Sequence, residues 1–220
     1  MNKDSNSIII LANGNFPSHQ IPLNLLKNQS KIICCDGAID KLKKIKIKAD
    51  FIIGDLDSIS NKSKKKYKDI TLYNPDQNFN DLYKALEWCE KNNFSNISIL
   101  GASGKREDHF LNNLFILFEF STFAKLQMIT DDGIFTLISK KTSFKSYSGQ
   151  PVSIISIDKT IKIKTTNLNF PINNKTLLNI YSGTLNYSNS TNFNISLTKG
   201  SILVFQKHSN ISSNEINTHS

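Results

Sequence analysis

Two carboxylates stand one residue apart at the end of a short apolar run in the segment ADFIIGDLDSIS, residues 49–60. The run FII at residues 51–53 is typical of a buried strand, and Gly54 then allows the chain to turn. Asp55 and Asp57 therefore project from the end of that strand. Because ionised carboxylates in a low-dielectric site need a partner of opposite charge, we expect the pair to bind a divalent cation.

Further acidic side chains stand where other predicted strands end. Asp36 follows KIICC, Asp76 and Asp81 follow TLY, and Asp108 lies just beyond ISIL. A single aspartate in such a place is more often a helix cap or a turn former, but a series at successive strand ends is harder to explain in that way. Ligands of open α/β sheets bind outside the carboxyl ends of the strands, so these side chains should converge on one crevice. Their hard oxygen atoms favour Mg²⁺, which typically binds through one or two carboxylates together with phosphates and water.

A glycine-rich turn in ILGASGKREDH, residues 99–109, supplies a second kind of chemistry. Gly101 and Gly104 flank a strand-to-helix connection whose backbone N–H groups can bind phosphate, and Lys105 and Arg106 add positive charge. The segment lacks the Walker pattern GxxxxGK[ST], and a glycine-rich turn alone is weak evidence. His109 fits a packed helix residue as well as it fits a catalyst. Beside the acidic groups, the turn indicates a phosphate-containing ligand.

Apolar runs alternate with helical patterns over residues 7–130, which predicts β-α units and a mostly parallel sheet. Apolar residues recur with helical spacing over residues 81–91, where Asn80 is a suitable N-cap, and over residues 107–120. The predicted strands cover residues 8–12, 32–35, 51–53, 70–73, 97–100 and 126–130.

The texture changes after about residue 142, where short β-type runs alternate with Gly, Asn, Pro and Ser. This pattern predicts an all-β region. We therefore expect an α/β fold class with two domains: residues 1–141, with a mostly parallel sheet flanked by helices, and residues 142–220, forming a β-sandwich.

The composition of the 220 residues, 39% of them hydrophobic, is that of a globular protein with a sizeable core. No run approaches the roughly 18 apolar residues of a membrane helix. The apolar run at residues 8–12 is too short for a signal-peptide core, so we expect a cytoplasmic protein without a membrane partner.

The net charge of +9 comes largely from lysine runs at residues 41–48 and 62–68. They read as solvated faces, because no nucleic-acid-binding motif accompanies them.

Five motifs together resemble the thiamine pyrophosphokinase (thiamin diphosphokinase) family, in that family's order and at comparable separations. They are LANGNFP (residues 11–17), CDGAIDKL (35–42), ADFIIGDLDS (49–58), DQNFNDLYKALEW (76–88) and GASGKREDHFLNN (101–113). The later segments FPINNKTL, YSGTLNYS and KGSILV are similar to the β-domain of the same family. The resemblance therefore spans nearly the whole chain.

The resemblance implies an enzyme that transfers the pyrophosphoryl group of ATP to the hydroxyl of thiamine and releases AMP. It implies Mg²⁺ as cofactor, ATP and thiamine as small-molecule partners, and a homodimer whose thiamine site includes the β-domain. By matched position it assigns Mg²⁺ to Asp55, Asp57 and Asp81, and the catalytic set is these three with Asp108. ATP-binding positions are Asp36, Gln77, Gly101, Gly104, Lys105, Arg106 and His109. Thiamine-binding positions are Asp81, Asp108, Thr184 and Asn186.

Departures from the family pattern and two other functions remain to be weighed. Ala38 stands where a second glycine is usual, Asn80 where threonine is frequent, and Leu185 where the family has a residue that can hydrogen-bond. The last difference affects the thiamine side of the pocket.

One alternative function is a phosphatase of the haloacid-dehalogenase type with Asp55 as nucleophile, for which Asp131 would belong to a later acidic motif. The other is a non-catalytic nucleotide- or thiamine-binding protein.

Overall fold

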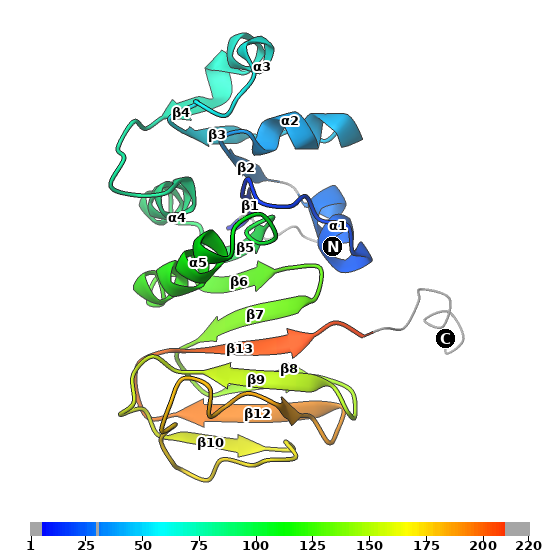
Figure 1. The fold of residues 1–220 in the computed structure, drawn as a ribbon, viewed down its shortest axis with the longest axis vertical. Coiled ribbons are helices and arrows are strands. Elements are labelled where there is room, and N and C mark those ends of the chain that lie inside the picture. The colour runs from blue at the N-terminus through cyan, green and yellow to red at the C-terminus, as the bar shows by residue number, and fades with distance from the viewer. Residues whose placement is uncertain (1–5, 30, 210–220) are drawn as a thin grey trace, which may run out of the picture.

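A ten-stranded sheet runs the length of the molecule in the computed structural model, which describes residues 6–29 and 31–209 (Figure 1). Its strand order is β11-β9-β13-β7-β6-β5-β1-β2-β3-β4. Within the run from β6 to β4 in that order, adjacent strands are parallel, whereas β6 and β7 are antiparallel. These parallel strands are β1 (Ser7–Leu11), β2 (Ile32–Cys35), β3 (Phe51–Gly54), β4 (Thr71–Tyr73), β5 (Asn96–Leu100) and β6 (Lys125–Ile129).

The predicted elements of this half are present, and each predicted strand end lies within one residue of the observed end. Helix α4 (Asp81–Lys91) has the predicted bounds, and α5 (Glu107–Glu119) is one residue shorter than predicted. Three helices were not predicted: α1 (Gln20–Asn28), α2 (Ala38–Leu42) and α3 (Asn61–Lys66). Helix α1 contains a proline, α2 has only five residues, and α3 reads NKSKKK, so none shows a long apolar repeat. Two 3₁₀ turns, η1 (Lys43–Ile45) and η2 (Lys68–Ile70), follow α2 and α3.

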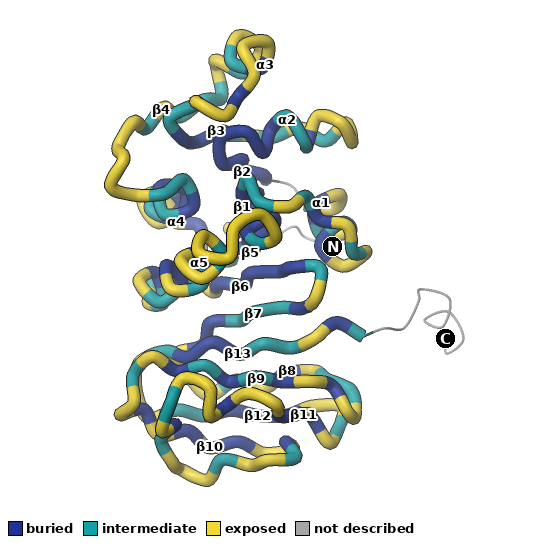
Figure 2. Tube along the Cα trace, in the orientation of Figure 1, coloured by how far each residue is buried: buried dark blue, intermediate teal, exposed yellow. Residues whose placement is uncertain are grey.

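Helices cover both faces of the parallel part of the sheet, and this explains its apolar runs. Ile8 and Ile10 pack with α4 and α5, whereas Ile9 and Leu11 pack with α1 and α2 on the other face. Because successive strand residues point to opposite faces, a strand buried on both faces is apolar throughout. The dark blue strands in Figure 2 show this burial.

The C-terminal half is antiparallel. Strands β7 (Gly133–Ile138), β13 (Ile202–Lys207), β9 (Pro151–Ile155) and β11 (Asn186–Tyr187) extend the large sheet. A second sheet contains β10 (Ile163–Thr166), β12 (Asn192–Leu197) and β8 (Thr142–Lys145). Apolar side chains of both sheets, such as Ile154 and Phe193, form one buried core between them. This half is a β-sandwich.

The large sheet crosses the predicted boundary after residue 141 without a break. β7 lies before that boundary and pairs along its whole length with β13, which lies after it. The division into domains 1–141 and 142–220 therefore stays a prediction. No helix among the described residues is both long and apolar enough to cross a membrane.

The strand order places a switch point beside β1. From β1 the chain proceeds outward through β2, β3 and β4, and then returns to β5 on the other side of β1. In open α/β sheets, ligands bind at such a point, in a crevice outside the carboxyl ends of the strands. The predicted site residues follow those ends.

Candidate active site

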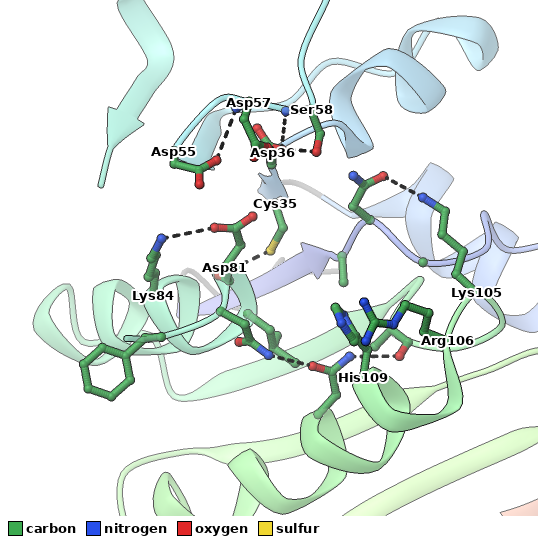
Figure 3. Close-up of a pocket in the computed structure, with 18 of the residues that line it drawn as sticks. Cys35, Asp36, Asp55, Asp57, Ser58, Asp81, Lys84, Lys105, Arg106 and His109 are labelled. Atoms are coloured by element: carbon green, nitrogen blue, oxygen red, sulfur yellow. Dashed lines mark hydrogen bonds and ion pairs between the residues drawn. The ribbon is translucent and has the colours of Figure 1, made fainter. Parts of the chain in front are cut away.

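A pocket of about 410 Å³ opens at this switch point. Its walls come from the loops that follow β1, β2, β3, β4 and β5, and from the N-terminal turns of α4 and α5. Figure 3 shows the carboxylates of Asp36, Asp55 and Asp57 gathered on one side, with Lys105 and Arg106 on the other. Of the aspartates expected at one crevice, Asp36, Asp55, Asp57 and Asp81 line it, whereas Asp76 and Asp108 do not.

Three carboxylates form the acidic side of the pocket. One oxygen from each of Asp36, Asp55 and Asp57 lies within 4.8 Å of the other two. The Oδ1 atom of Asp36 is buried and has no hydrogen-bond partner among the described residues. Burial, the largest cause, raises the pKa of Asp36, and nearby Asp57 and Asp55 raise it further. A buried oxygen without a donor beside two more carboxylates fits a hard divalent cation, so this trio could hold one.

Backbone turns bring these carboxylates together. Asp36 and Leu56 both have positive φ angles, 43° and 68°, in the region that L-residues rarely adopt. The N–H of Asp57 donates to Oδ1 of Asp55 at 3.2 Å, and the N–H of Ser58 donates to Oδ2 of Asp36 at 3.0 Å. Strained residues of this kind cluster at functional sites, where the surrounding structure compensates for their cost. The loop after β3 is therefore shaped around the carboxylates.

Asp81, predicted as a metal ligand, lies beside the trio rather than in it. Its carboxylate accepts a hydrogen bond from Nζ of Lys84 at 3.4 Å, and Lys84, which is 4% exposed, also donates to the carbonyl of Asn74 at 3.0 Å. Burial raises the pKa of Asp81 to about 6, while Lys84 opposes that shift. The structure adds Asp36 to the carboxylates that can share one ion, and the metal role of Asp81 stays a prediction.

Gln77 lines the pocket, and its side chain is engaged with an acidic residue. Its Nε2 donates to Oδ2 of Asp55 at 2.8 Å. This bond is the largest cause of the lowered pKa of Asp55. Gln77 therefore keeps Asp55 ionised and oriented. Its predicted contact with ATP is not tested by this geometry.

The opposite side is made by two loops bonded to each other. The N–H of Gly14 donates to the carbonyl of Gly101 at 2.7 Å, and the N–H of Asn15 donates to that of Ser103 at 2.8 Å. A Cβ on Gly14 would lie 2.3 Å from the Gly101 oxygen, so only glycine allows this approach. Gly101 and Gly104 have φ angles of 66° and 89°, as a tight phosphate-binding turn requires.

Cationic and imidazole side chains complete that side. Lys105, Arg106 and His109 line the pocket and are exposed. Arg106 donates from Nε and Nη2 to the carboxylate of Asp108 at 3.0 and 2.5 Å. This pairing lowers the pKa of Asp108, which is itself exposed and does not line the pocket. Asp108 is thus placed to orient Arg106, and its predicted catalytic and thiamine-binding roles stay predictions.

Several pocket residues were not assigned a role from the sequence. Asn13 and Gly14 belong to the LANGNFP motif at the end of the central strand, so their position was a usable signal. Lys84 follows Asp81 by one helical turn, and that spacing could also have identified it. Asn80 was interpreted only as a helix cap, and Asn113 only as part of a motif. Both line the pocket.

Models of one protein family match almost the whole described chain. The model described as thiamin pyrophosphokinase, catalytic domain, matches residues 23–130, and that for the thiamin pyrophosphokinase substrate-binding domain matches residues 133–205. The chain belongs to the thiamin pyrophosphokinase family. The resemblance found in the five motifs is thereby confirmed.

Curated relatives carry the same family name. Thiamin pyrophosphokinase 1 of Caenorhabditis elegans is 31% identical over 124 residues, which cover 52% of this chain and 51% of that protein. Thiamine pyrophosphokinase 1 of Oryza sativa subsp. japonica is 29% identical over 162 residues, covering 66% and 60%. The chain spans about half to three fifths of the length of these relatives.

Solved thiamin pyrophosphokinase structures share the fold. The Bacillus subtilis protein superposes with a TM-score of 0.78 at 22% identity, covering 92% of this chain and 99% of that one. The yeast protein has a TM-score of 0.77 at 19% identity, covering 94% and 87%. The predicted fold class, a mostly parallel α/β sheet plus an antiparallel β-rich part, is confirmed.

Neither family membership nor the geometry of the pocket supports the phosphatase alternative. Asp131, which that alternative needs near Asp55, accepts hydrogen bonds from the backbone N–H groups of Ser18 and His19 at 3.0 Å and does not line the pocket. Hydrogen bonds from Ser18 and His19 lower its pKa against the opposing effect of burial. Asp131 therefore fixes the start of α1.

The two thiamine-binding positions predicted in the β-sandwich do not line this pocket. Asn186 is 5% exposed, and its side chain bonds both the N–H and the carbonyl of Phe170, at 3.0 and 2.7 Å. The hydroxyl of Thr184 donates to the carbonyl of Tyr181 at 2.8 Å. Leu185 between them has a φ of 61° and is 88% exposed. Within one chain these side chains hold a loop, and their predicted thiamine contacts stay predictions.

Proposed function

We propose that this chain transfers the pyrophosphoryl group of ATP to the hydroxyl of thiamine, giving thiamine diphosphate and AMP. The observation that carries the proposal is the pocket itself, in a chain of the thiamin pyrophosphokinase family. Three carboxylates within reach of one ion face a glycine-lined, cationic wall across a single crevice. This is the arrangement that a metal-bound polyphosphate needs.

Charge and position account for most of the catalysis. Phosphoryl-type transfer depends mainly on holding the reacting groups in line and neutralising developing charge. Asp36, Asp55 and Asp57 would hold Mg²⁺, which when bound neutralises phosphate oxygens. The N–H groups of residues 101–104 and the guanidinium of Arg106 provide donors for the same phosphates.

The acceptor also suits the acidic side of the pocket. Thiamine carries a permanently positive thiazolium ring, which a carboxylate-rich surface favours electrostatically. Asp81 lies at that side, and its side chain is 28% exposed. Asp81 is therefore the carboxylate that we assign to the thiamine side of the pocket.

Product analysis tests the reaction. The protein is incubated with ATP, Mg²⁺ and either thiamine or thiamine monophosphate, and nucleotides are separated by chromatography. We expect AMP and thiamine diphosphate in equal amounts with thiamine only. ADP as product, or phosphate released from thiamine monophosphate without AMP, would contradict the proposal. Bound thiamine without AMP above background would favour a non-catalytic binding protein.

We also propose that the protein is a homodimer joined through its β-sandwich. Large apolar side chains are exposed over residues 170–187, among them Leu178 at 78% and Tyr181 at 69%. Exposed large apolar side chains concentrated in one segment indicate a protein interface. Light scattering should give twice the 24.8 kDa chain mass, and Leu178→Asp should lower it toward the monomer. Ile45→Asp, a change at an exposed apolar residue in the α/β half, is the matched control. A monomeric wild-type protein would exclude the dimer.

A cytoplasmic location is proposed as well. Cys34, Cys35 and Cys89 are buried as free thiols, and burial raises the pKa of each, which keeps them unreactive. Free buried thiols fit a reducing compartment. Fractionation of cells that express the full-length protein tests this location.

A further inference from the structure

Two asparagine side chains form an unbroken hydrogen-bond chain between the two sides of the pocket. Oδ1 of Asn80 accepts from the N–H of Tyr83 at 2.9 Å, and Nδ2 of Asn80 donates to Oδ1 of Asn113 at 3.1 Å. Nδ2 of Asn113 then donates to the carbonyl of Ala102 at 3.0 Å. The chain starts at the first turn of α4, crosses α5 and ends in the glycine-rich turn after β5.

The direction of this chain is dictated at both ends. A backbone N–H can only donate, so Asn80 must present its oxygen to Tyr83 and its amide nitrogen to Asn113. A backbone carbonyl can only accept, so Asn113 must present its nitrogen to Ala102. Each carboxamide therefore has one orientation. Hydrogen bonds that run in one direction along a chain also polarise one another.

The two ends of this row of hydrogen bonds lie next to an acidic residue of the pocket and to the glycine-rich turn. Asn80 is followed directly by Asp81 on the acidic side, and Ala102 lies between Gly101 and Ser103 on the phosphate side. Ala102 and Asn113 are 5% and 8% exposed, so water competes little for these bonds. These hydrogen bonds join one side of the pocket to the other.

Capping of α4 does not require asparagine at position 80. Serine, threonine and aspartate cap helices about as well, and each uses one oxygen for that purpose. The amide nitrogen of Asn80 is additional to the cap, and it is the atom that bonds Asn113. Threonine at this position would be shorter by one heavy atom and would have no second donor group.

We propose that Asn80 and Asn113 are positioning residues that set the separation between the acidic loop and the glycine-rich turn, so that both sides hold one magnesium-nucleotide at the same time. The inference rests on the proposed function. It predicts that breaking this row of hydrogen bonds lowers kcat/KM for ATP far more than it changes KM for thiamine.

The test compares Asn80→Ser, Asn113→Ala and the double variant with the wild type. Asn80→Ser keeps an oxygen for the cap and removes the bond to Asn113. Asn80→Ser loses one of these hydrogen bonds and Asn113→Ala loses two. Each single change should therefore lower kcat/KM for ATP at least about tenfold, with KM for thiamine within about twofold. Because the two residues act as one unit, kcat/KM for ATP of the double variant should fall about as far as in the more impaired single variant. Independent effects would instead multiply the two fold-losses.

Asn92→Ser is the matched control. Asn92 lies at the other end of α4, where its side chain donates to the carbonyl of Trp88 at 2.8 Å outside the pocket. It should leave kcat/KM for ATP unchanged. Equal effects of Asn92→Ser and Asn80→Ser would mean that helix capping alone is measured, and would overturn the proposal.

Calorimetry with Mg²⁺ and a non-hydrolysable ATP analogue provides a readout separate from turnover. In the wild type, Mg²⁺ should raise the affinity for the analogue, and both variants should lose about tenfold of that gain while metal-free binding stays unchanged. Variants that only melt at lower temperature, with kcat/KM and this gain unaltered, would show a purely structural role and overturn the proposal. A wild type that makes no AMP would refute the proposed reaction. The positioning role of Asn80 and Asn113 would then be tested by calorimetry alone.

Discussion

The two sides of the pocket are built in opposite ways. On the acidic side Asp36 is buried, Asp55 is held by Gln77, and Asp81 is bonded to a buried lysine. On the phosphate side Lys105 and Arg106 are exposed, and Arg106 pairs with Asp108, which is exposed too. Buried groups thus hold part of the acidic side, whereas the cations of the phosphate side lie at the surface.

This difference follows from what each side must bind. Carboxylates brought close together repel one another, so folding must hold them in place, and a cation then relieves the repulsion. Exposed cations are well solvated and can rotate onto an anion at little cost. Changes on the acidic side should therefore alter the stability of the metal-free fold, without unfolding it, as well as catalysis, whereas changes on the phosphate side should alter catalysis alone.

The largest effect is expected at the carboxylate trio. Asp55→Asn and Asp57→Asn each remove a charge from the site that would hold Mg²⁺, and turnover should fall about 100- to 1,000-fold. Circular dichroism melts in EDTA should show a fold that survives, because neither side chain packs in the core. Asp69→Asn, at an exposed position on η2, is the control. Unfolding of both variants would mean that these carboxylates are structural.

A smaller effect is expected on the phosphate side. Arg106→Gln removes the charged donors, and kcat/KM for ATP should fall about 10- to 100-fold with KM for thiamine little changed. Arg106→Lys should recover part of the loss, since it keeps the charge without the planar fork. The melting temperature without ligand should not change. A loss confined to KM for thiamine would place Arg106 on the wrong side of the pocket.

Asp81 should make the stability of the metal-free protein depend on pH. Its pKa is raised to about 6 by burial, against about 3.9 in an unfolded chain, so the folded state binds this proton more tightly. The stabilisation is complete below about pH 4 and is lost as the pH rises through about 6. In EDTA, the melting temperature of the wild type should fall by a few degrees relative to Asp81→Asn over that interval. Parallel curves would contradict the raised pKa.

The smallest effect on kinetics is expected at Lys41, which bonds the loop after β1 on the phosphate side. Nζ of Lys41 donates to the carbonyls of Asn13 and Gly14, and burial with nearby Lys105 lowers the pKa of Lys41 to about 8. Lys41→Met should raise KM for ATP a few-fold, because the loop loses these bonds. Lys44→Met, at an exposed position, should leave KM unchanged. Equal kinetics of both variants would mean that the loop does not need this support.

The elements and the chemistry of the site were predictable from the sequence because they are encoded locally. A strand buried on both faces must be apolar throughout, and α4 has both an apolar repeat and a capping asparagine. The carboxylates after those strands identified the acidic side, and the glycine turn identified the phosphate side. Helices α1 and α3 were missed, since a proline and a lysine run obscure their pattern.

Only the tertiary structure decided how these parts meet. The trio within 4.8 Å contains Asp36 rather than Asp81, because β2 lies between β1 and β3 and Asp36 turns inward with a positive φ. Asn80 and Asn113 are 33 residues apart, and no local pattern shows that their side chains bond. The single sheet through both halves likewise depends on β7 pairing with the distant β13. Such contacts follow from strand order and packing, which a local sequence pattern does not specify.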